Sequence, residues 1–385
     1  MKARAALLSM LLVVSLVGAA AAPAAAQDAS GEAYSGAHVQ FDAGSSSVAN
    51  YAVNGDVLVE NVTIQSSSKA RSQTGVNIDA DLETATNFRG SGLQVASKTS
   101  VSATIAVESG AEMQTHDNSR GVFQVRAQES DQMVRANISE RAQAESKGDK
   151  RVVVTKEDGS EGSFIVIGDG EVVVNEQGNV TAEVKEGSQL VYRQYDTGRD
   201  DGDEKRERMI QNGTATAEVY IQQAQQSGED SSDESQEAAA SVVEYGQDTS
   251  VEVTSQSKNN VEMAVDRSQS QGKVVLTTVS ESAFDSAENI QVLVDGEAAA
   301  QADSYSAVEQ SAMQGDQPRY YVSQSSSANA AANVAIGIDH FSTRNVQMTS
   351  GDGEGDTSNG SGAGFGALVA LAALGAALVG TRRRQ

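Results

Sequence analysis

The chain has 385 residues, with 28 Lys and Arg against 53 Asp and Glu, three His, two Pro and neither Cys nor Trp. Without Cys, this sequence excludes disulfide frameworks, thiolate metal sites and Cys nucleophiles. Its length indicates about two domains and is sufficient for a sizeable buried core.

Residues 1–26 have the three-part layout of a secretory signal peptide. Lys2 and Arg4 precede an apolar run over residues 5–17, and residues 24–26 are all Ala, a small-residue cleavage site. An uncleaved membrane helix is the alternative, but the apolar run is short for one. We therefore expect export, and a mature chain that begins near Gln27.

The exported body, residues 27–362, is strongly acidic. It holds 23 basic and 53 acidic side chains, a net charge of −30. Such a charge repels nucleic acids, so no nucleic-acid partner is expected. It also opposes compaction unless salt screens it, and at 1 M salt the Debye length is only about 3 Å. The charge therefore predicts a protein adapted to brine, with intrinsic disorder as the alternative.

The apolar residues of this body favour strands. Residues 27–362 contain 39 Val but only 6 Leu, and β-branched side chains suit a pleated, half-buried surface. The fold class is therefore expected to be mainly β, with two β-rich modules and one or two short helices. Each module would be sandwich-like or an extended meander, and a faint likeness between residues 62–66 and 253–257 leaves a β-solenoid as the alternative fold.

The first module is expected over residues 27–222. Its apolar runs lie at residues 57–64, 101–107, 122–125, 151–155, 163–167, 171–174, 180–184 and 189–192. Asp158-Gly159 and Asp169-Gly170 predict hairpin turns, so the runs from 151 to 192 are interpreted as one meander.

A helix is expected at residues 203–211, where Glu204 and Arg208 lie four residues apart. The acidic residues 200–204 that lead into it do not have the ligand spacing of an EF-hand. We interpret them as an N-cap whose acids favour the positive end of the helix dipole.

A polar linker is expected over residues 223–240, followed by a second β-rich module over residues 241–349. The strand pattern resumes at residues 242–243, 251–253, 261–265, 273–276, 290–294, 320–322 and 334–338. Asp295-Gly296 predicts a turn, and a capping box that starts at Ser306 predicts a short helix.

The C-terminal 36 residues divide into three segments. Residues 350–362 alternate Gly with Asp, Ser and Thr and predict a flexible stalk. Residues 363–381 carry no charge, and a helix of this length at 1.5 Å per residue crosses a hydrocarbon core of about 30 Å. The basic residues among 382–385 then form a cytoplasmic tail by the positive-inside rule. We expect a transmembrane helix that anchors the protein in membrane lipid, on the outer face of the cell membrane.

This order of segments resembles haloarchaeal surface proteins with a PGF-CTERM sorting tail. The residues that carry the resemblance are Gly364 and Phe365, followed by the basic cluster Arg382, Arg383 and Arg384, while Ala363 stands where the family has Pro. Residues 338–343 are also similar to the His-Phe-Ser strand that closes β modules before such tails. The resemblance implies recognition by a membrane archaeosortase, cleavage near the motif and attachment of a lipid anchor. A body that projects from the membrane into or just beneath the surface layer would have the surface-layer glycoprotein as a neighbour.

Five asparagines stand in Asn-x-Ser/Thr sequons and are glycosylation candidates. They are Asn61, Asn137, Asn179, Asn212 and Asn359. Modification at these positions is chemically accessible in an exported chain.

The sequence contains no recognisable catalytic or cofactor motif. His38, His116 and His340 lie far apart and none has a companion at metal-ligand spacing. We interpret His340 as a strand residue and His116-Asp117 as part of a turn with Asn118. No enzyme activity, cofactor or metal site is expected.

The sequence therefore predicts a membrane-anchored, salt-adapted cell-surface protein with a structural or interaction role in an archaeal envelope. The alternative is an anchored module that binds a solute, a cation or a neighbouring cell. A surface hydrolase is a third hypothesis.

Overall fold

The computed structural model describes residues 32–74, 82–222, 240–284, 289–315, 317–324 and 330–350. The protein is mainly β, as expected, and its described residues include three short α-helices. These helices are α1 (Ser67–Thr74), α2 (Asp201–Gln211) and α3 (Tyr305–Gln314), and a 3-10 turn, η1, covers Leu82–Thr84. The expected signal peptide, stalk and membrane anchor, and nearly all of the expected linker, lie outside the described residues.

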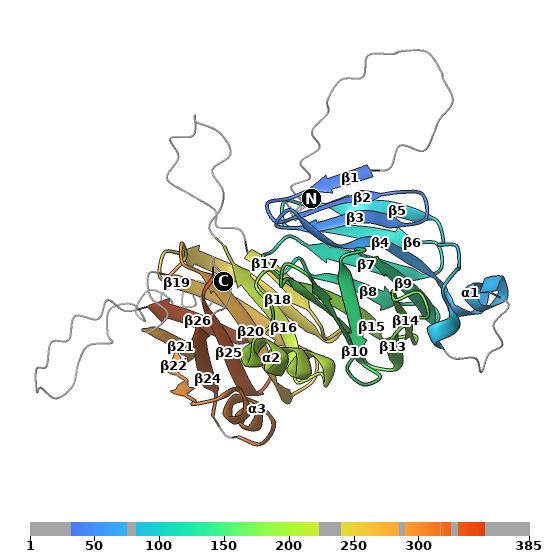
Figure 1. The fold of residues 1–385 in the computed structure, drawn as a ribbon. Coiled ribbons are helices and arrows are strands. Elements are labelled where there is room, and N and C mark those ends of the chain that lie inside the picture. The colour runs from blue at the N-terminus through green and yellow to red at the C-terminus, as the bar shows by residue number, and fades with distance from the viewer. Residues whose placement is uncertain are drawn as a thin grey trace, which may run out of the picture.

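The first half of the chain forms two antiparallel sheets, which we call the N-terminal sheet pair (Figure 1). The seven-stranded sheet contains, in spatial order, β1 (Glu32–Ser35), β2 (Val39–Ala43), β3 (Val48–Val53), β4 (Asp56–Ser66), β9 (Gln132–Ile138), β14 (Val180–Val184) and β13 (Gly170–Val174). The eight-stranded sheet contains β10 (Ala142–Ser146), β11 (Arg151–Lys156), β12 (Glu161–Ile167), β15 (Gln189–Tyr195), β8 (Phe123–Ala127), β7 (Ala111–His116), β6 (Ser102–Val107) and β5 (Leu93–Lys98).

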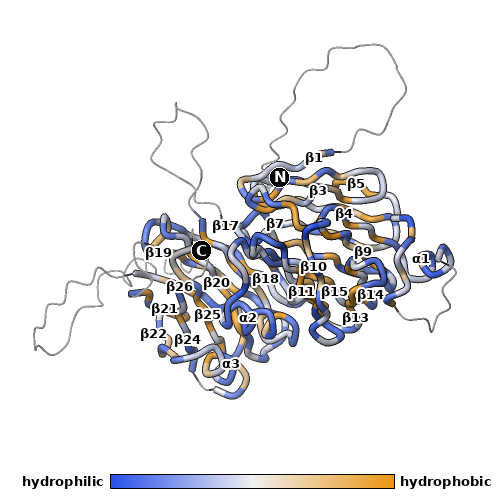
Figure 2. Tube along the Cα trace, in the orientation of Figure 1, coloured by the Kyte–Doolittle hydropathy of each residue, from blue (hydrophilic) through white to orange (hydrophobic). Residues whose placement is uncertain are grey.

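These two sheets enclose one hydrophobic core, because alternate residues of each strand face inward. The hydropathy of the chain alternates accordingly along the strands (Figure 2). Four buried rings, those of Tyr51, Phe123, Phe164 and Tyr192, contact one another at the centre, with centroids as close as 4.8 Å. Burial of each such side chain contributes about 1.5–3 kcal/mol, so this cluster is a main source of stability for the sheet pair.

The second half forms the C-terminal sheet pair, which encloses a core of its own. The six-stranded sheet contains β17 (Ala240–Glu244), β16 (Ala215–Ile221), β20 (Gln271–Ser280), β25 (Ala330–His340), β24 (Arg319–Gln324) and β23 (Ala300–Gln301). The five-stranded sheet contains β18 (Thr249–Ser257), β19 (Asn260–Arg267), β26 (Arg344–Ser350), β21 (Ile290–Val294) and β22 (Glu297–Ala298). Strand β16 precedes the expected linker in sequence but pairs within this second half.

The expected hairpins at Asp158-Gly159 and Asp295-Gly296 are confirmed, since they join β11 to β12 and β21 to β22. The single meander expected from residue 151 to 192 is wrong. At Asp169-Gly170 the chain leaves the eight-stranded sheet, where β12 pairs with β15, and enters the seven-stranded sheet, where β13 pairs with β14. A Cβ at Gly170 would lie 2.2 Å from the carbonyl oxygen of Glu183, so this crossing requires glycine.

Two of the helices cover the outer face of the six-stranded sheet (Figure 1). Helix α2 confirms the helix expected at residues 203–211, with its first residue two positions earlier. The expected cap of the next helix is wrong by two positions, because Ser304, not Ser306, accepts the hydrogen bond of the N-cap from the backbone N–H of Ala307. Nearly all ladders are antiparallel, unlike the parallel coils of the β-solenoid alternative.

Candidate functional site

Helix α2 lies between the two sheet pairs and presents buried polar groups to both. Asp200 caps it: the carboxylate accepts the backbone N–H of Asp203 at 2.7 Å, and the Asp203 carboxylate accepts that of Asp200. The N-cap interpretation of the acidic lead is therefore confirmed. Asp203, Arg206 and Glu207 all point into the protein, although this helix is polar in composition.

Arg206 belongs to a fully buried group of four side chains that we call the Arg–Glu cluster: Arg193, Arg206, Glu218 and Tyr245. The Glu218 carboxylate accepts hydrogen bonds from Nη1 and Nη2 of Arg193, at 3.0 and 3.2 Å, and from Nη2 of Arg206 at 2.5 Å. The Tyr245 hydroxyl donates a further hydrogen bond at 2.7 Å. Burial alone would raise the pKa of Glu218, but the two guanidinium groups outweigh it and lower that pKa to about 2.

A second buried carboxylate, that of Glu207, ties α2 to the N-terminal sheet pair. It accepts hydrogen bonds from the Tyr195 hydroxyl at 2.8 Å, from Nε and Nη2 of Arg199 at 2.9 Å each, and from Nη1 of Arg151 at 3.1 Å. Arg193 and Tyr195 come from β15, whereas Glu218 comes from β16 in the other sheet pair. The two halves are thus joined by buried, charge-assisted hydrogen bonds.

These buried ions were not anticipated from the sequence. A signal was present: β15 and β16 are buried along their whole lengths, and each carries one charge, Arg193 or Glu218, in an apolar strand. A charge in such a place is almost always paired. With no solvent access, this network positions neighbouring groups and cannot itself receive a ligand.

Above the Arg–Glu cluster lies an open depression of about 550 Å³, which we call the α2–α3 cleft. Residues Asp200, Asp201 and Lys205 at the start of α2 form one wall, and Tyr305 at the start of α3 forms another. Strands β24 and β25 supply the floor, which contains Tyr321, Ser323, Gln324 and Asn333. The volume lies within the usual range for small-molecule sites.

A hydrogen-bond relay connects the floor of this cleft to the Arg–Glu cluster. Nη2 of Arg206 donates to the Thr278 hydroxyl at 2.9 Å, and that hydroxyl donates to Oδ1 of Asn333 at 3.0 Å. The hydrogen bond from Thr278 therefore fixes the orientation of the Asn333 amide from the buried side of the strand. Its Nδ2 has no acceptor among the described residues, and Asn333 lines the cleft although it is only 5% exposed.

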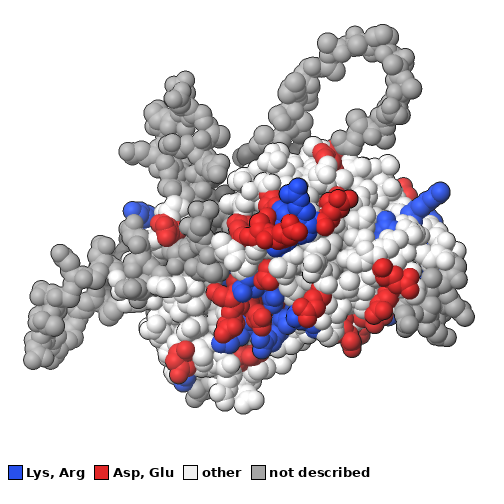
Figure 3. Space-filling view, viewed as in Figure 1, with Lys and Arg blue, Asp and Glu red and all other residues white. Residues whose placement is uncertain are grey.

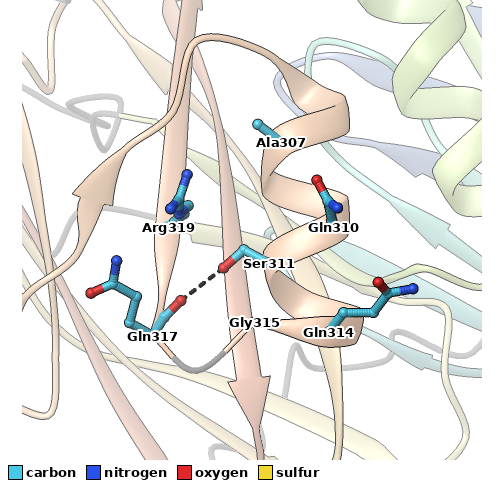
Figure 4. Close-up of a pocket in the computed structure, with 7 residues that line it drawn as sticks. All are labelled: Ala307, Gln310, Ser311, Gln314, Gly315, Gln317 and Arg319. Carbon is cyan, nitrogen blue, oxygen red and sulfur yellow. Dashed lines mark hydrogen bonds between the residues drawn. The ribbon is translucent and has the colours of Figure 1, made fainter.

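A smaller cavity of about 230 Å³ lies at the other end of α3 (Figure 4). Its lining includes Gln310 and Gln314 of α3 and Arg319 of β24, and the Ser311 hydroxyl donates to the carbonyl oxygen of Gln317 at 2.7 Å. It lacks aromatic side chains and buried charged partners, so the α2–α3 cleft is the better candidate site.

The structure brings three of the five predicted glycosylation candidates together in one row across the seven-stranded sheet. Asn61 on β4 is the direct cross-strand partner of Asn137 on β9. Asn179 lies just before β14, and its Oδ1 accepts the backbone N–H of Ile138 at 3.0 Å. All three side chains are partly exposed. We call Asn61, Asn137 and Asn179 the sequon row.

The other two candidates lie elsewhere. Asn212 is exposed at the end of α2, where its Nδ2 donates to Glu309 at 3.3 Å. Asn359 and the sorting-tail residues Ala363, Gly364, Phe365, Arg382, Arg383 and Arg384 lie outside the described residues. Within the described ranges, no helix is long and apolar enough to cross a membrane, and no group of three or more acidic or His side chains could hold a metal ion.

The three histidines occupy unrelated positions. The ring of His38 is hydrogen-bonded to the side chains of Asn54 and Gln222. His340, at the end of β25, is exposed, and its Nδ1 is hydrogen-bonded to Asp339 at 2.8 Å. His116 ends β7 and is buried where this strand meets β17, with Nε2 at 3.3 Å from Gln124.

The expected turn exists but begins after His116, which is still part of β7: the backbone N–H of Gly121 donates to the carbonyl oxygen of Asn118. The adjacent Asp117 does not orient the imidazole of His116. Its carboxylate accepts the backbone N–H groups of residues 37–39 instead.

No protein-family model matches this chain, and no curated protein matches it in sequence. Among solved structures it is similar to a family 81 glycoside hydrolase from Clostridium thermocellum, with 9% identity and a TM-score of 0.35 over 82% of this chain and 34% of that one. A heparan sulfate lyase from Pedobacter heparinus has 10% identity and a TM-score of 0.16, over 46% and 26% of the two chains. The chain thus spans about a third of the first of these structures. Both likenesses are too distant to support an argument about fold or function.

Proposed function

We propose that the protein is a membrane-anchored, salt-adapted cell-surface protein with a structural or interaction role in an archaeal envelope. In this proposal residues 1–26 direct export and residues 363–381 form a transmembrane anchor that an archaeosortase recognises. Each sheet pair is then one β-sandwich module of the exported body, and surface-layer glycoprotein is the expected neighbour.

The observation that carries the proposal is the sequon row. Three asparagines that are up to 118 positions apart in sequence lie side by side on one sheet, with their amides partly exposed. A glycan is bulky and hydrophilic, so this face would be solvated and kept from close packing, as suits the outside of a cell. The hydroxyls of Thr63 and Thr181, which complete two of the sequons, are buried, so modification of Asn61 and Asn179 would precede folding.

A direct test is fractionation of the native host in high salt, with mass spectrometry of both mature termini and protease treatment of intact cells. We expect a membrane-bound chain that begins near Gln27 and is shortened by external protease. An end near Ala363 would indicate archaeosortase processing. An intact chain from Met1 to Gln385, protected inside the cell, would overturn the proposal.

The sequon row adds a test by glycopeptide analysis. Directly opposed residues have Cβ atoms about 5 Å apart, so glycans on Asn61 and Asn137 would exclude each other. We expect no molecule with both sites occupied, and higher occupancy of Asn61 in Asn137→Gln. Asn212→Gln, on a different element, is the matched control and should leave the row unchanged. Absence of glycan from every sequon would remove this support.

An anchored binding module remains a second candidate function. The α2–α3 cleft favours this function, because the cleft combines a volume suited to a small molecule with the nearly buried amide of Asn333, whose orientation is fixed by Thr278.

A further inference from the structure

We propose that the α2–α3 cleft binds a neutral carbohydrate. This inference rests on the second candidate function, that of a binding module, and names its ligand class.

The cleft offers two tyrosine rings at an angle to each other. The rings of Tyr305 and Tyr321 are 5.0 Å apart between centroids and inclined by 69°. The Tyr305 hydroxyl is already bonded to Ser323 at 2.9 Å, which holds its ring in place, and Tyr321 remains partly exposed in the floor. Tyr305 is itself only 4% exposed, so the ring that a ligand can reach is that of Tyr321, which is supported by its contact with Tyr305. The C–H face of a sugar ring can pack on such an apolar surface.

Beside these rings, the floor presents a hydrogen-bond donor of fixed direction. The relay from Arg206 through Thr278 occupies Oδ1 of Asn333, so the nearly buried amide offers Nδ2 to the cleft. This donor opens on the cleft, where water can solvate it, and a ligand oxygen placed in the same direction can take the place of that water. Gln324 adds an amide that can both donate and accept, so the floor suits a hydroxyl, which also does both.

The charged and polar residues that line the cleft make anionic and aliphatic ligands unfavourable. Asp200 and Asp201 face the cleft with a single cation, Lys205, so the wall is net negative and disfavours anions. Carboxylates can instead accept hydrogen bonds from ligand hydroxyls. The many polar groups disfavour an aliphatic chain, whose burial would leave them without partners. A neutral, polyhydroxylated ring can pack its C–H face on the tyrosine, accept the hydrogen bond of Asn333 and donate its own hydroxyls to the carboxylates.

The test is binding to the purified full chain in detergent at several molar KCl, measured by calorimetry. The probes are glucose, galactose and mannose with the disaccharides maltose and lactose, and choline is the cationic comparison. Variants Tyr321→Ala and Asn333→Asp should each lower the affinity for the best saccharide by at least about tenfold, because one removes the ring and the other replaces the donor by an acceptor. Tyr321→Phe keeps the ring and should bind like wild type.

Gln314→Ala, which alters the smaller cavity at the other end of α3, is the matched control and should not change binding. Circular dichroism of each variant checks that it is folded. The proposal is overturned if no neutral saccharide binds saturably, if Tyr321→Ala binds as well as wild type, or if choline binds in preference to the sugars. Surface location is measured separately by fractionation, so either proposal can fail alone.

Discussion

At the residue scale, the most unusual feature of the molecule is the number of ions that it buries between its halves. Glu218 alone accepts four hydrogen bonds, three of them from guanidinium nitrogens. Removing these charges from water costs several kcal/mol per ion, which their mutual attraction only offsets. We therefore expect their benefit to be specificity: one arrangement of α2 against β15 and β16 pairs each charge, and a shifted arrangement leaves a buried ion unpaired. Hydrogen bonding is incomplete even so, because Nε of Arg193 and Nε and Nη1 of Arg206 have no partner among the described residues.

We predict that Glu218→Gln destabilises the protein by about 3–5 kcal/mol, because Arg193 and Arg206 would then be buried without a countercharge. Unfolding by guanidinium chloride followed by circular dichroism measures the change. Glu204→Gln is the control, since the Glu204 side chain is 40% exposed and pairs with Arg208 at 3.0 Å and, more loosely, with Arg199 at 3.6 Å, and pairs in contact with solvent contribute at most about 1 kcal/mol. Equal effects of the two substitutions would contradict the argument.

His116 should make the stability of the protein depend on pH between about 6.5 and 4. Burial lowers the pKa of this ring from 6.5 to about 4; the bond to Gln124 opposes the shift and the charge of Arg126 adds to it. Above pH 6.5 the ring is neutral in both the folded and unfolded states. Below it only the unfolded chain takes up the proton, so the free energy of unfolding falls by about 3 kcal/mol by pH 4.

His116→Gln should remove this part of the pH dependence, measured as thermal unfolding at a series of pH values in constant salt. His38→Gln serves as the control, since that ring is partly exposed. If the unfolding temperatures of His116→Gln and wild type change by the same amount with pH, the imidazole of His116 takes up no proton on unfolding and the prediction is wrong.

At the element scale, α3 can lie on its sheet only because two glycines leave room for it. A Cβ on Gly272 of β20 would lie 1.9 Å from the carbonyl oxygen of Ala312, and one on Gly337 of β25 would lie 2.7 Å from that of Val308. Both of these obstacles are helix backbone, which cannot rotate away, and the Cβ on Gly272 would also lie 2.4 and 2.6 Å from the carbonyl oxygens of Asp339 and Ile338 on β25. The position of α3, and with it the Tyr305 wall of the α2–α3 cleft, thus depends on residues that have no side chain.

Gly272→Ala is therefore expected to displace α3 and to cost at least about 2 kcal/mol. Gly213→Ala is the comparison: its Cβ would meet nothing within 4 Å, but its φ of +72° strains any other residue by about 1 kcal/mol. Hydrogen exchange separates the two cases, because only Gly272→Ala should accelerate exchange of the amides of residues 305–314. Protected α3 amides in that variant would refute the displacement.

The strands could be predicted from the sequence, but their partners could not. The alternation of Val with polar residues shows which side chains face a core, and it does not show which strand lies alongside. Residues 163–167 and 171–174 illustrate this, since they have the same pattern on either side of Asp169-Gly170 and belong to different sheets. The candidate site has the same limitation: the capping role of Asp200 could be predicted, but its position beside Tyr321 and Asn333 depends on contacts across more than 100 residues.

At the scale of the whole molecule, the buried and exposed charges should respond differently to salt. The network between the halves is shielded from water, so dissolved ions do not screen it. The exposed charges include patches of acidic side chains, intermixed with basic ones over α2 (Figure 3). Residues 27–362 have a net charge of −30, and its self-repulsion acts mainly through water, where the Debye length grows from about 3 Å at 1 M salt to about 10 Å at 0.1 M. Dilution of salt therefore strengthens the repulsion while the buried pairs stay the same.

We accordingly predict that the body loses strand structure when KCl falls from several molar to tenths of molar, because unscreened repulsion then exceeds the marginal stability of a folded domain. Far-ultraviolet circular dichroism over a KCl series measures the transition. Sucrose added at low salt strengthens apolar burial without screening charge, so it should restore less structure than KCl does if charge is the cause. Glu218→Gln should shift the midpoint to higher KCl, whereas Glu204→Gln, which removes an exposed negative charge, should leave it unchanged or lower it. A spectrum that stays constant across the whole series would show that the net charge does not limit folding.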